Sequence, residues 1–204
     1  MSVVQNNTIS TNSITEATSA NGVTIDGVKL KDNGVIVGDG GTIGSASDTD
    51  AISISSGGYV VDSARPHFVV DATGSSSVEI AHNGRVPFND EVRDHGGNFD
   101  TSNYWFLTPV AGVYMFHAKI YTYHATVVAY SFYIMSHDDD DGDSVTLTRV
   151  RDARSSNSGQ HISMTAISYL SANRRISVIN GTGSARHIYL GTQDHSTFSG
   201  CLIG

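Results

Sequence analysis

The chain has 204 residues and a mass of 21.7 kDa, enough for one ordinary domain and a short additional segment. Apolar residues make up 39% of it and charged residues only 16%, which excludes a coiled coil, and no Gly-X-Y period indicates collagen. A net charge of −8 argues against nucleic acid or an anionic membrane surface as a main partner, because phosphate recognition needs clustered Lys and Arg.

The first 59 residues differ in composition from the rest. Residues 1–20 are rich in Ser, Thr, Asn and Gln, and such a segment buries too little apolar surface to fold alone. Residues 21–44 alternate short apolar triplets with Asn-Gly and Asp-Gly steps, which predicts two or three small β-turn-β elements. Residues 45–58 are expected to be a linker. The apolar positions expected to form the docking surface of this N-terminal arm are Val23, Ile25, Val28, Leu30, Val35 and Val37.

Residues 60–204 predict an all-β domain, because alternating or β-rich runs recur with turn residues between them. About ten strands in roughly 145 residues is typical of a two-sheet sandwich or jelly roll. The expected strands are 67–71, 77–81, 104–108, 112–124, 126–136, 144–151, 161–170, 175–180, 187–191 and 197–203.

Two of these runs, 112–124 and 126–136, carry apolar residues on both faces. A sandwich strand that meets water should be polar on its outer face, and a large exposed apolar patch is rare on a soluble monomer. Either another subunit covers this outer face, which we favour, or a loop or the N-terminal segment does. The aromatic residues expected in the core or around a subunit axis are Phe106, Tyr114, Phe116, Tyr121, Tyr123, Tyr130, Phe132, Tyr133 and Phe198.

The segment 99–116, FDTSNYWFLTPVAGVYMF, resembles the signature of the globular heads of complement component 1, subcomponent q, which are related to the tumour necrosis factor jelly rolls. The final STFSGCLIG is similar to the last strand of that family, with Cys201 at an aromatic position. No collagen stalk precedes the head, and residues 170–176 depart from the family's Leu-x-x-Gly-Asp turn. The resemblance covers about residues 66–204 and implies a ten-stranded jelly roll that forms a homotrimer around an aromatic axis.

The N-terminal GVTIDGV at 22–28, followed by Leu30-Lys31-Asp32, is similar to segments of structural proteins of marine tailed phages. We therefore expect a non-enzymatic virion protein, assembled in the host cytoplasm. It would be a homotrimeric capsid decoration or cement protein, or a short head fibre, attached by its arm to the major capsid protein or a tail component. The alternatives are a tail-fibre or receptor-binding head for a host surface glycan or protein, and a free soluble binding module.

The acidic run at 138–143 is the most prominent local pattern. As an EF-hand loop it fails, because Thr148 stands where the twelfth ligand should be Glu. A solvated hairpin tip is the favoured interpretation, and a divalent-cation site is the other. In the second case the calcium ligands would be Asp139, Asp140, Asp141 and Asp143, and no other cofactor is expected.

Enzyme signatures are missing from the sequence: there is no Gly-x-Ser-x-Gly elbow and no phosphate-binding loop followed by a helix. The single cysteine, Cys201, excludes an internal disulfide and is expected to be a buried packing residue. Tyr104 and Trp105 are expected in the core, although such aromatics can also stack on sugars. The arginines at 149–154 and 174–175 are expected to be solvated or to pair with the acidic tip of a neighbouring subunit.

No run approaches the roughly 18 apolar residues of a membrane-spanning helix. The first ten residues also lack the basic and apolar regions of a secretory signal, so synthesis and folding in the cytoplasm are expected. The nine histidines show no zinc-binding spacing and are expected to be scattered over the surface or an interface.

Overall fold

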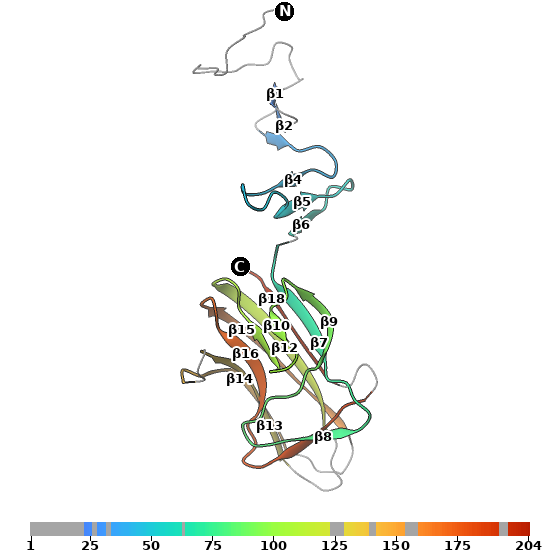
Figure 1. The fold of residues 1–204 in the computed structure, drawn as a ribbon, viewed down its shortest axis with the longest axis vertical. Helices are drawn as coiled ribbons and strands as arrows, with labels where there is room; N and C mark the ends of the chain where they lie inside the picture. Colours follow the sequence, from blue (N-terminus) through green and yellow to red (C-terminus); the bar gives the residue numbers. More distant parts are fainter. Residues whose placement is uncertain are drawn as a thin grey trace, which may run out of the picture. The chain divides into compact units, whose positions relative to one another are not determined.

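The structure is a computed structural model that describes residues 23–25, 28–31, 34–62, 64–122, 129–138, 142–153, 159–191 and 196–204. It divides into two compact units, Met1–Ala64, here called the arm, and Arg65–Gly204, here called the head. All regular elements in the described ranges are β-strands (Figure 1). No helix in those ranges has the length and apolar character needed to cross a bilayer.

The arm contains two antiparallel sheets of three short strands each. They are β1 (Val23–Ile25), β2 (Val28–Lys31) and β3 (Gly34–Ile36), then β4 (Thr42–Ile43), β5 (Ile52–Ile54) and β6 (Val60–Asp62). The turn at Asp39-Gly40 places Gly40 at a φ of 75°, a conformation that glycine adopts without strain. The expected linker at 45–58 is wrong, because β5 is the central strand of the second sheet.

The head is a sandwich of two antiparallel sheets (Figure 1). The seven-stranded sheet has the order β8-β17-β12-β18-β7-β9, with β15 paired to β12, and the five-stranded sheet has the order β10-β11-β16-β13-β14. The strands are β7 (His67–Asp71), β8 (Ser77–Ile80), β9 (Asp90–His95), β10 (Phe99–Asp100), β11 (Trp105–Leu107), β12 (Gly112–Thr122), β13 (Ala129–His137), β14 (Val145–Ala153), β15 (Gln160–Leu170), β16 (Arg175–Asn180), β17 (Arg186–Tyr189) and β18 (Thr197–Leu202).

The predicted all-β jelly roll is thus confirmed, and each of the ten expected strands has a counterpart in the head. The short strands β9 and β10 are additional. β9 has the sequence DEVRDH and is mostly exposed, so it lacks the apolar alternation by which the other strands were recognised. It occupies the edge of the seven-stranded sheet, where charged residues discourage pairing with another chain.

Aromatic side chains fill the space between the two sheets. Phe68 lies at the centre of this cluster, with its ring centroid 4.5 Å from that of Phe106 and 4.9 Å from that of Phe198. Alternate residues of β12 point into the same core, since every second side chain on this strand is buried. Six of the aromatic residues singled out in the sequence have at most 1% of their surface exposed and belong to the core of one chain: Phe106, Tyr114, Phe116, Tyr130, Phe132 and Phe198.

The first and last strands of the head, β7 and β18, lie side by side within the seven-stranded sheet. The Leu202 amide donates a hydrogen bond of 3.0 Å to the Pro66 carbonyl, and the Val113 amide donates to the Gly204 carbonyl. β7 and β18 are therefore neighbours, with Gly200 opposite Phe68. The residues that follow the arm in the sequence lead directly into the sheet whose outer face is described next.

Candidate subunit interface and polar pocket

The outer face of the seven-stranded sheet carries an apolar strip. The strand register places Met115 on β12 between Ile167 on β15 and Cys201 on β18. Two residues further along β12, on the same face, Val113 lies opposite Tyr169. Ile167 and Tyr169 are 63% and 68% exposed, although they are large and apolar. We call the set the outer apolar strip; it comprises Val69, Val113, Met115, Ile167, Tyr169, Cys201 and Ile203.

A hollow of about 210 Å³ lies at the part of this strip formed by β7, β12 and β18. Val69, Met115 and Cys201 line it together with two histidines, His67 and His117. His67 stacks on His95 of β9, with ring centroids 5.3 Å apart and planes 4° from parallel. The face therefore combines rigid strands with exposed apolar side chains and a hollow, which are properties of a surface that another protein covers.

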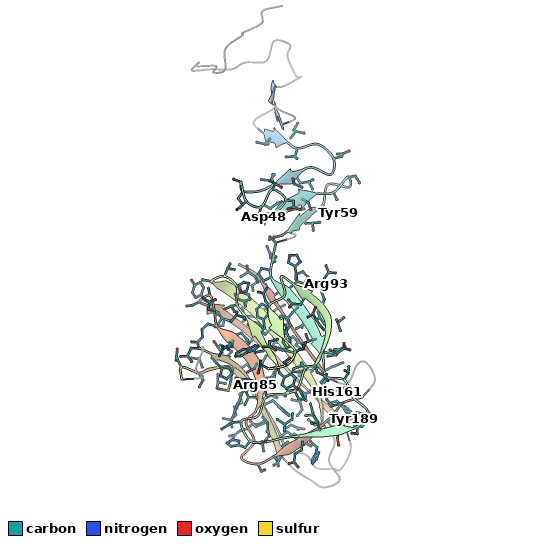
Figure 2. All side chains as sticks on the ribbon, in the orientation of Figure 1. Asp48, Tyr59, Arg85, Arg93, His161 and Tyr189 are labelled. Carbon is teal, nitrogen blue, oxygen red and sulfur yellow. The ribbon has the colours of Figure 1, made fainter. Side chains whose placement is uncertain are left out.

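Two other expected axis aromatics have contacts inside one chain. The Tyr121 ring lies 4.9 Å from His161 and 5.9 Å from Tyr189, both labelled in Figure 2. Tyr133 donates from its hydroxyl to the Gly181 carbonyl at 3.2 Å, and the Arg149 guanidinium lies 5.1 Å from its ring. Both tyrosines are partly exposed. Tyr123 lies outside the described residues.

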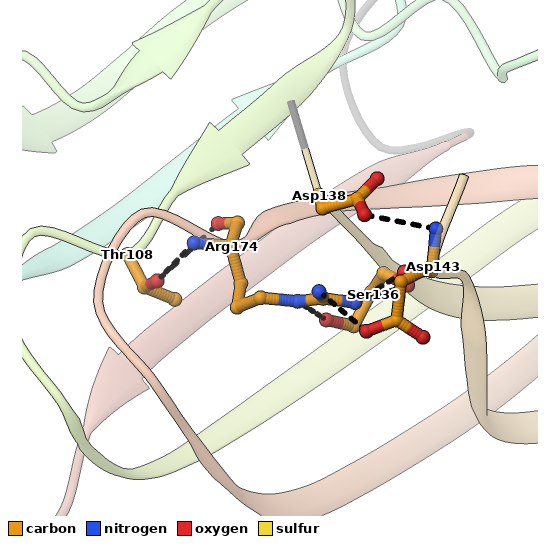
Figure 3. A network of polar contacts seen from close by, with 5 residues as sticks. All are labelled: Thr108, Ser136, Asp138, Asp143 and Arg174. Carbon is orange, nitrogen blue, oxygen red and sulfur yellow. Dashed lines mark hydrogen bonds and ion pairs between the residues drawn. The ribbon is translucent and has the colours of Figure 1, made fainter. Parts of the chain in front are cut away.

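Arg174, the residue before β16, contacts both the acidic run and Ser136 of β13 (Figure 3). The Arg174 guanidinium donates to Ser136 Oγ at 2.9 Å and forms an ion pair with Asp143 at 3.1 Å. Its backbone amide donates to Thr108 Oγ1 at 2.8 Å, and the Asp143 amide donates to Asp138 Oδ2 at 2.9 Å. Arg174 thus pairs with the acidic tip of its own chain.

Most of the expected cation ligands are not among the residues that the structure describes. Asp139, Asp140 and Asp141 lie outside the described residues, and the Asp143 side chain is 73% exposed and faces Arg174. Among the residues with described placement, no group of three or more His, Cys, Asp or Glu is arranged to hold a metal ion. Calcium binding at this tip therefore stays a prediction of the sequence.

A second hollow, here called the polar pocket, lies on the outer side of the five-stranded sheet and has a volume of about 640 Å³. Its lining combines an aromatic ring with amide, guanidinium, imidazole and hydroxyl groups. His137 is buried, and its Nε2 atom forms a hydrogen bond of 2.8 Å with Ser177 Oγ. The main lining residues are Asn83, Arg85, Ser102, Asn103, Tyr104, Met135, His137 and Ser144.

Trp105 adjoins this pocket, but two arginine side chains contact its ring. The Arg175 guanidinium lies 3.6 Å from the centroid of its ring, and that of Arg85 lies 5.2 Å away. These are cation–π distances, and they make Trp105 a support for two arginines. Of the aromatic pair singled out in the sequence, Tyr104 is the residue that lines the pocket.

Two pocket residues have left-handed backbones. Asn83 has a φ of 60° and Tyr104 a φ of 62°, which is an unfavourable conformation for a bulky side chain. Asp100 holds the second turn: its Oδ1 accepts from the amides of Ser102 and Asn103 at 2.8 and 2.9 Å. The hydrogen bond from the Asn103 side chain is the main reason why the pKa of Asp100 lies below its usual value. The turn is therefore most stable with Asp100 ionised.

Replacing Asp100 with asparagine is expected to destabilise the head by about 1 kcal/mol at neutral pH, because charge-assisted hydrogen bonds are lost. The lowered folded-state pKa means that the ionised side chain stabilises the fold fully above about pH 4 and loses this effect as the pH falls. Thermal unfolding of both proteins should show a difference that shrinks towards pH 3. Asp90→Asn on exposed β9 is the control, and a difference independent of pH would contradict the explanation.

The head has the fold of the jelly rolls found in complement and tumour necrosis factor proteins. The structure of the TNF protein Eiger from S. frugiperda matches with a TM-score of 0.59 at 15% identity, covering 69% of this chain and 93% of that chain. The globular domain of zebrafish complement 1qA protein matches with a TM-score of 0.55 at 20% identity, covering 68% and 98%. Murine APRIL matches with a TM-score of 0.54 at 11% identity, covering 68% and 99%. At these identities the likeness concerns the fold.

The C1q domain model matches residues 67–203, which is most of the chain. The protein therefore belongs to the C1q domain family, and the resemblance of residues 66–204 to the globular heads of complement component 1, subcomponent q, is confirmed. No curated protein sequence matches the chain. The match begins at the first residue of β7 and includes the outer apolar strip and the polar pocket.

Sequence reasoning found one part of the outer apolar strip and missed another. The apolar character of both faces of the run 112–124, which is β12, indicated an apolar outer face, whereas Ile167 and Tyr169 of β15 were not singled out. The sequence did contain a signal for them. In the run 161–169, HISMTAISY, the alternation of a strand places Ile162, Met164 and Ala166 on one face and Ile167 and Tyr169 on the other. The polar pocket had no local signal, because its lining comes from separate segments around residues 83, 103, 135 and 144.

Proposed function

We propose that the chain is a non-enzymatic structural protein of a tailed-phage virion that acts as a homotrimer. The head holds three copies together through the outer apolar strip, and the arm attaches them to the major capsid protein or to a tail component. The observation that carries this proposal is the exposed apolar surface on one rigid sheet of a C1q-type head. The N-terminal phrase at 22–28, which resembles segments of phage structural proteins, supports the virion assignment.

The outer apolar strip favours association for a simple energetic reason. Burying a large aliphatic or aromatic side chain contributes about 1.5–3 kcal/mol relative to leaving it in water. Ile167 and Tyr169 retain more than 60% of their exposure in the single chain, so most of this gain remains available to a subunit contact. Both residues stand on strands, which lose little conformational freedom when a partner binds.

The position of β15 adds a second reason. This strand has eleven residues and is hydrogen-bonded along its whole length to β12. Among the described residues, β15 pairs with no strand other than β12. It is therefore a long edge strand, and it carries exposed apolar side chains. Such edges tend to pair or pack with another chain unless they are covered. A neighbouring copy that covers β15 removes both the edge and the apolar surface from water.

Virion location is tested most directly on intact phage particles that encode this chain. The proposal predicts that purified particles contain the protein and that cryo-electron microscopy shows threefold density for it on the capsid or the tail. Absence of the protein from purified particles, with abundant protein in the infected cell, would contradict the virion assignment.

A second candidate function is recognition of a host surface glycan through the polar pocket. The observation that favours it is Tyr104, which a strained but well-anchored turn presents beside amide and guanidinium groups. An aromatic ring next to planar hydrogen-bonding groups suits the apolar face and the hydroxyls of a sugar. The rigid turn around Asp100 supplies the preorganisation that such a site needs.

Replacing Tyr104 with alanine is expected to lower binding of the intact protein to host cells at least about tenfold, equivalent to about 1.4 kcal/mol. Labelled protein and cell sorting give the measurement. Tyr59→Ala, which removes a 76% exposed tyrosine of the arm, is the matched control and should bind as the unmodified protein does. Equal binding by both variants, or no binding of the unmodified protein to host cells, would exclude this function.

A further inference from the structure

The second sheet of the arm has one apolar face. Its register aligns Ile43, Ile52 and Asp62 in one row and Ile54 with Val60 in the next. Because residues two apart on a strand share a face, these rows lie on the same side of the sheet. The opposite side carries the row Thr42, Ser53 and Val61.

This apolar face is in contact with water in the single chain. Ile43 is 47% exposed, Ile52 is 39% exposed and Val60 is 69% exposed. For a sheet with strands of two or three residues, this is a large share of its apolar side chains. The sheet therefore exposes the surface that it would need to bury in order to be stable.

The first sheet of the arm repeats the pattern in its backbone register. Val23, Leu30 and Val35 align in one row, and Ile25 pairs with Val28. These five residues are among the arm positions that the sequence analysis singled out. Val35 is 62% exposed. Two successive small sheets thus place apolar residues in register, although three short strands alone supply too little burial for independent stability.

The connection between arm and head determines which partner is nearest. β6 ends at Asp62, and β7, a strand of the sheet that carries the outer apolar strip, begins at His67. The four intervening residues span at most about 14 Å. If three heads associate, three copies of the second sheet are tethered close together, at an effective concentration in the millimolar range. Weak apolar contacts between them are then sufficient for assembly.

We propose that the apolar faces of three β4–β6 sheets pack against one another around a threefold axis and form a short trimeric β-stalk that precedes the head in the chain. The occupants of each face are therefore the same sheets of the other two copies. This proposal rests on the homotrimer proposed above. The β1–β3 sheets continue the stalk by the same rule. The two small sheets of the arm then act as a spacer, and the attachment proposed for the arm falls to its residues 1–22.

The test compares two aspartate substitutions at adjacent positions of β5 in the full chain. Ile52→Asp places a carboxylate on the apolar face, whereas Ser53→Asp places one on the opposite face of the same strand. Sedimentation velocity reports whether the heads remain trimeric, and hydrogen exchange with mass spectrometry reports the protection of residues 42–62. In the unmodified trimer, amides of this segment should exchange at least about a hundredfold more slowly than in an unstructured chain.

The proposal predicts that Ile52→Asp remains trimeric but that amides of residues 42–62 exchange at least about tenfold faster than in the unmodified trimer. Ser53→Asp should exchange at the unmodified rate. Equal protection in both variants, or an unprotected segment in the unmodified trimer, would overturn the stalk. Protection that appears only on the phage particle would also overturn it and would make this face a docking surface. A monomeric unmodified protein would instead contradict the homotrimer, so the two failures are distinguishable.

Discussion

Replacing Ile167 with aspartate is expected to dissociate the homotrimer while leaving each head folded. Ile167 is 63% exposed in the single chain, so a carboxylate there meets water and disturbs little. In the trimer the same carboxylate would be buried in an apolar contact without a partner, which costs several kcal/mol. We expect the concentration for half-dissociation to rise at least about a hundredfold. Because the dissociation constant of a trimer scales with the square of that concentration, this corresponds to about 5.5 kcal/mol per trimer.

Sedimentation velocity over a range of concentrations measures this change, and circular dichroism reports whether the head stays folded. Val145→Asp is the matched control, because Val145 is a 51% exposed aliphatic residue on β14 of the other sheet. It should assemble as the unmodified protein does. If Ile167→Asp assembles equally well, the outer apolar strip is not the subunit interface.

Replacing Gly200 with valine is expected to destabilise the head by about 3 kcal/mol or more. A Cβ atom at this position would lie 2.5 Å from Phe116 Cδ1 and 2.7 Å from Phe68 Cε1. Both rings are buried, and Phe68 is fixed by Phe106 at 4.5 Å and Phe198 at 4.9 Å. Neither ring can move aside without disturbing the whole aromatic cluster.

Urea unfolding followed by tryptophan fluorescence and circular dichroism measures this loss. Gly183→Val is the control, because a Cβ at Gly183 has no atom within 4 Å and the residue is exposed. It should unfold at nearly the unmodified urea concentration. Equal stability of both variants would contradict the packing described for Gly200, Phe68 and Phe116.

The head was predictable from the sequence because its long strands carry their own signal. On β12 the side chains that alternate in polarity and size also alternate in burial, and a period of two is a local property of a strand. The small strand β5 was missed for the opposite reason. Its Ile-Ser-Ile core is too short to stand out from a serine-rich segment, and it exists because β4 and β6 pair with it on both sides.

The contacts of the sites were less predictable, because the chain brings together residues from distant segments. Arg174 reaches Asp143 because β16 pairs with β13, with Arg175 opposite His137. The sequence left Arg174 either solvated or paired with the acidic tip of a neighbouring subunit, and nothing local indicated a contact within the chain. Likewise, Asn83 and Tyr104 line one pocket only because separate turns meet above β13 and β16.

Sedimentation velocity and equilibrium measurements on the unmodified full-length chain, at micromolar concentration, give the most direct test of self-association through the head. The account predicts one dominant species with three times the 21.7 kDa mass of a single chain. A well-folded species of 21.7 kDa would show that the outer apolar strip tolerates water, and it would contradict the homotrimer and the proposed stalk.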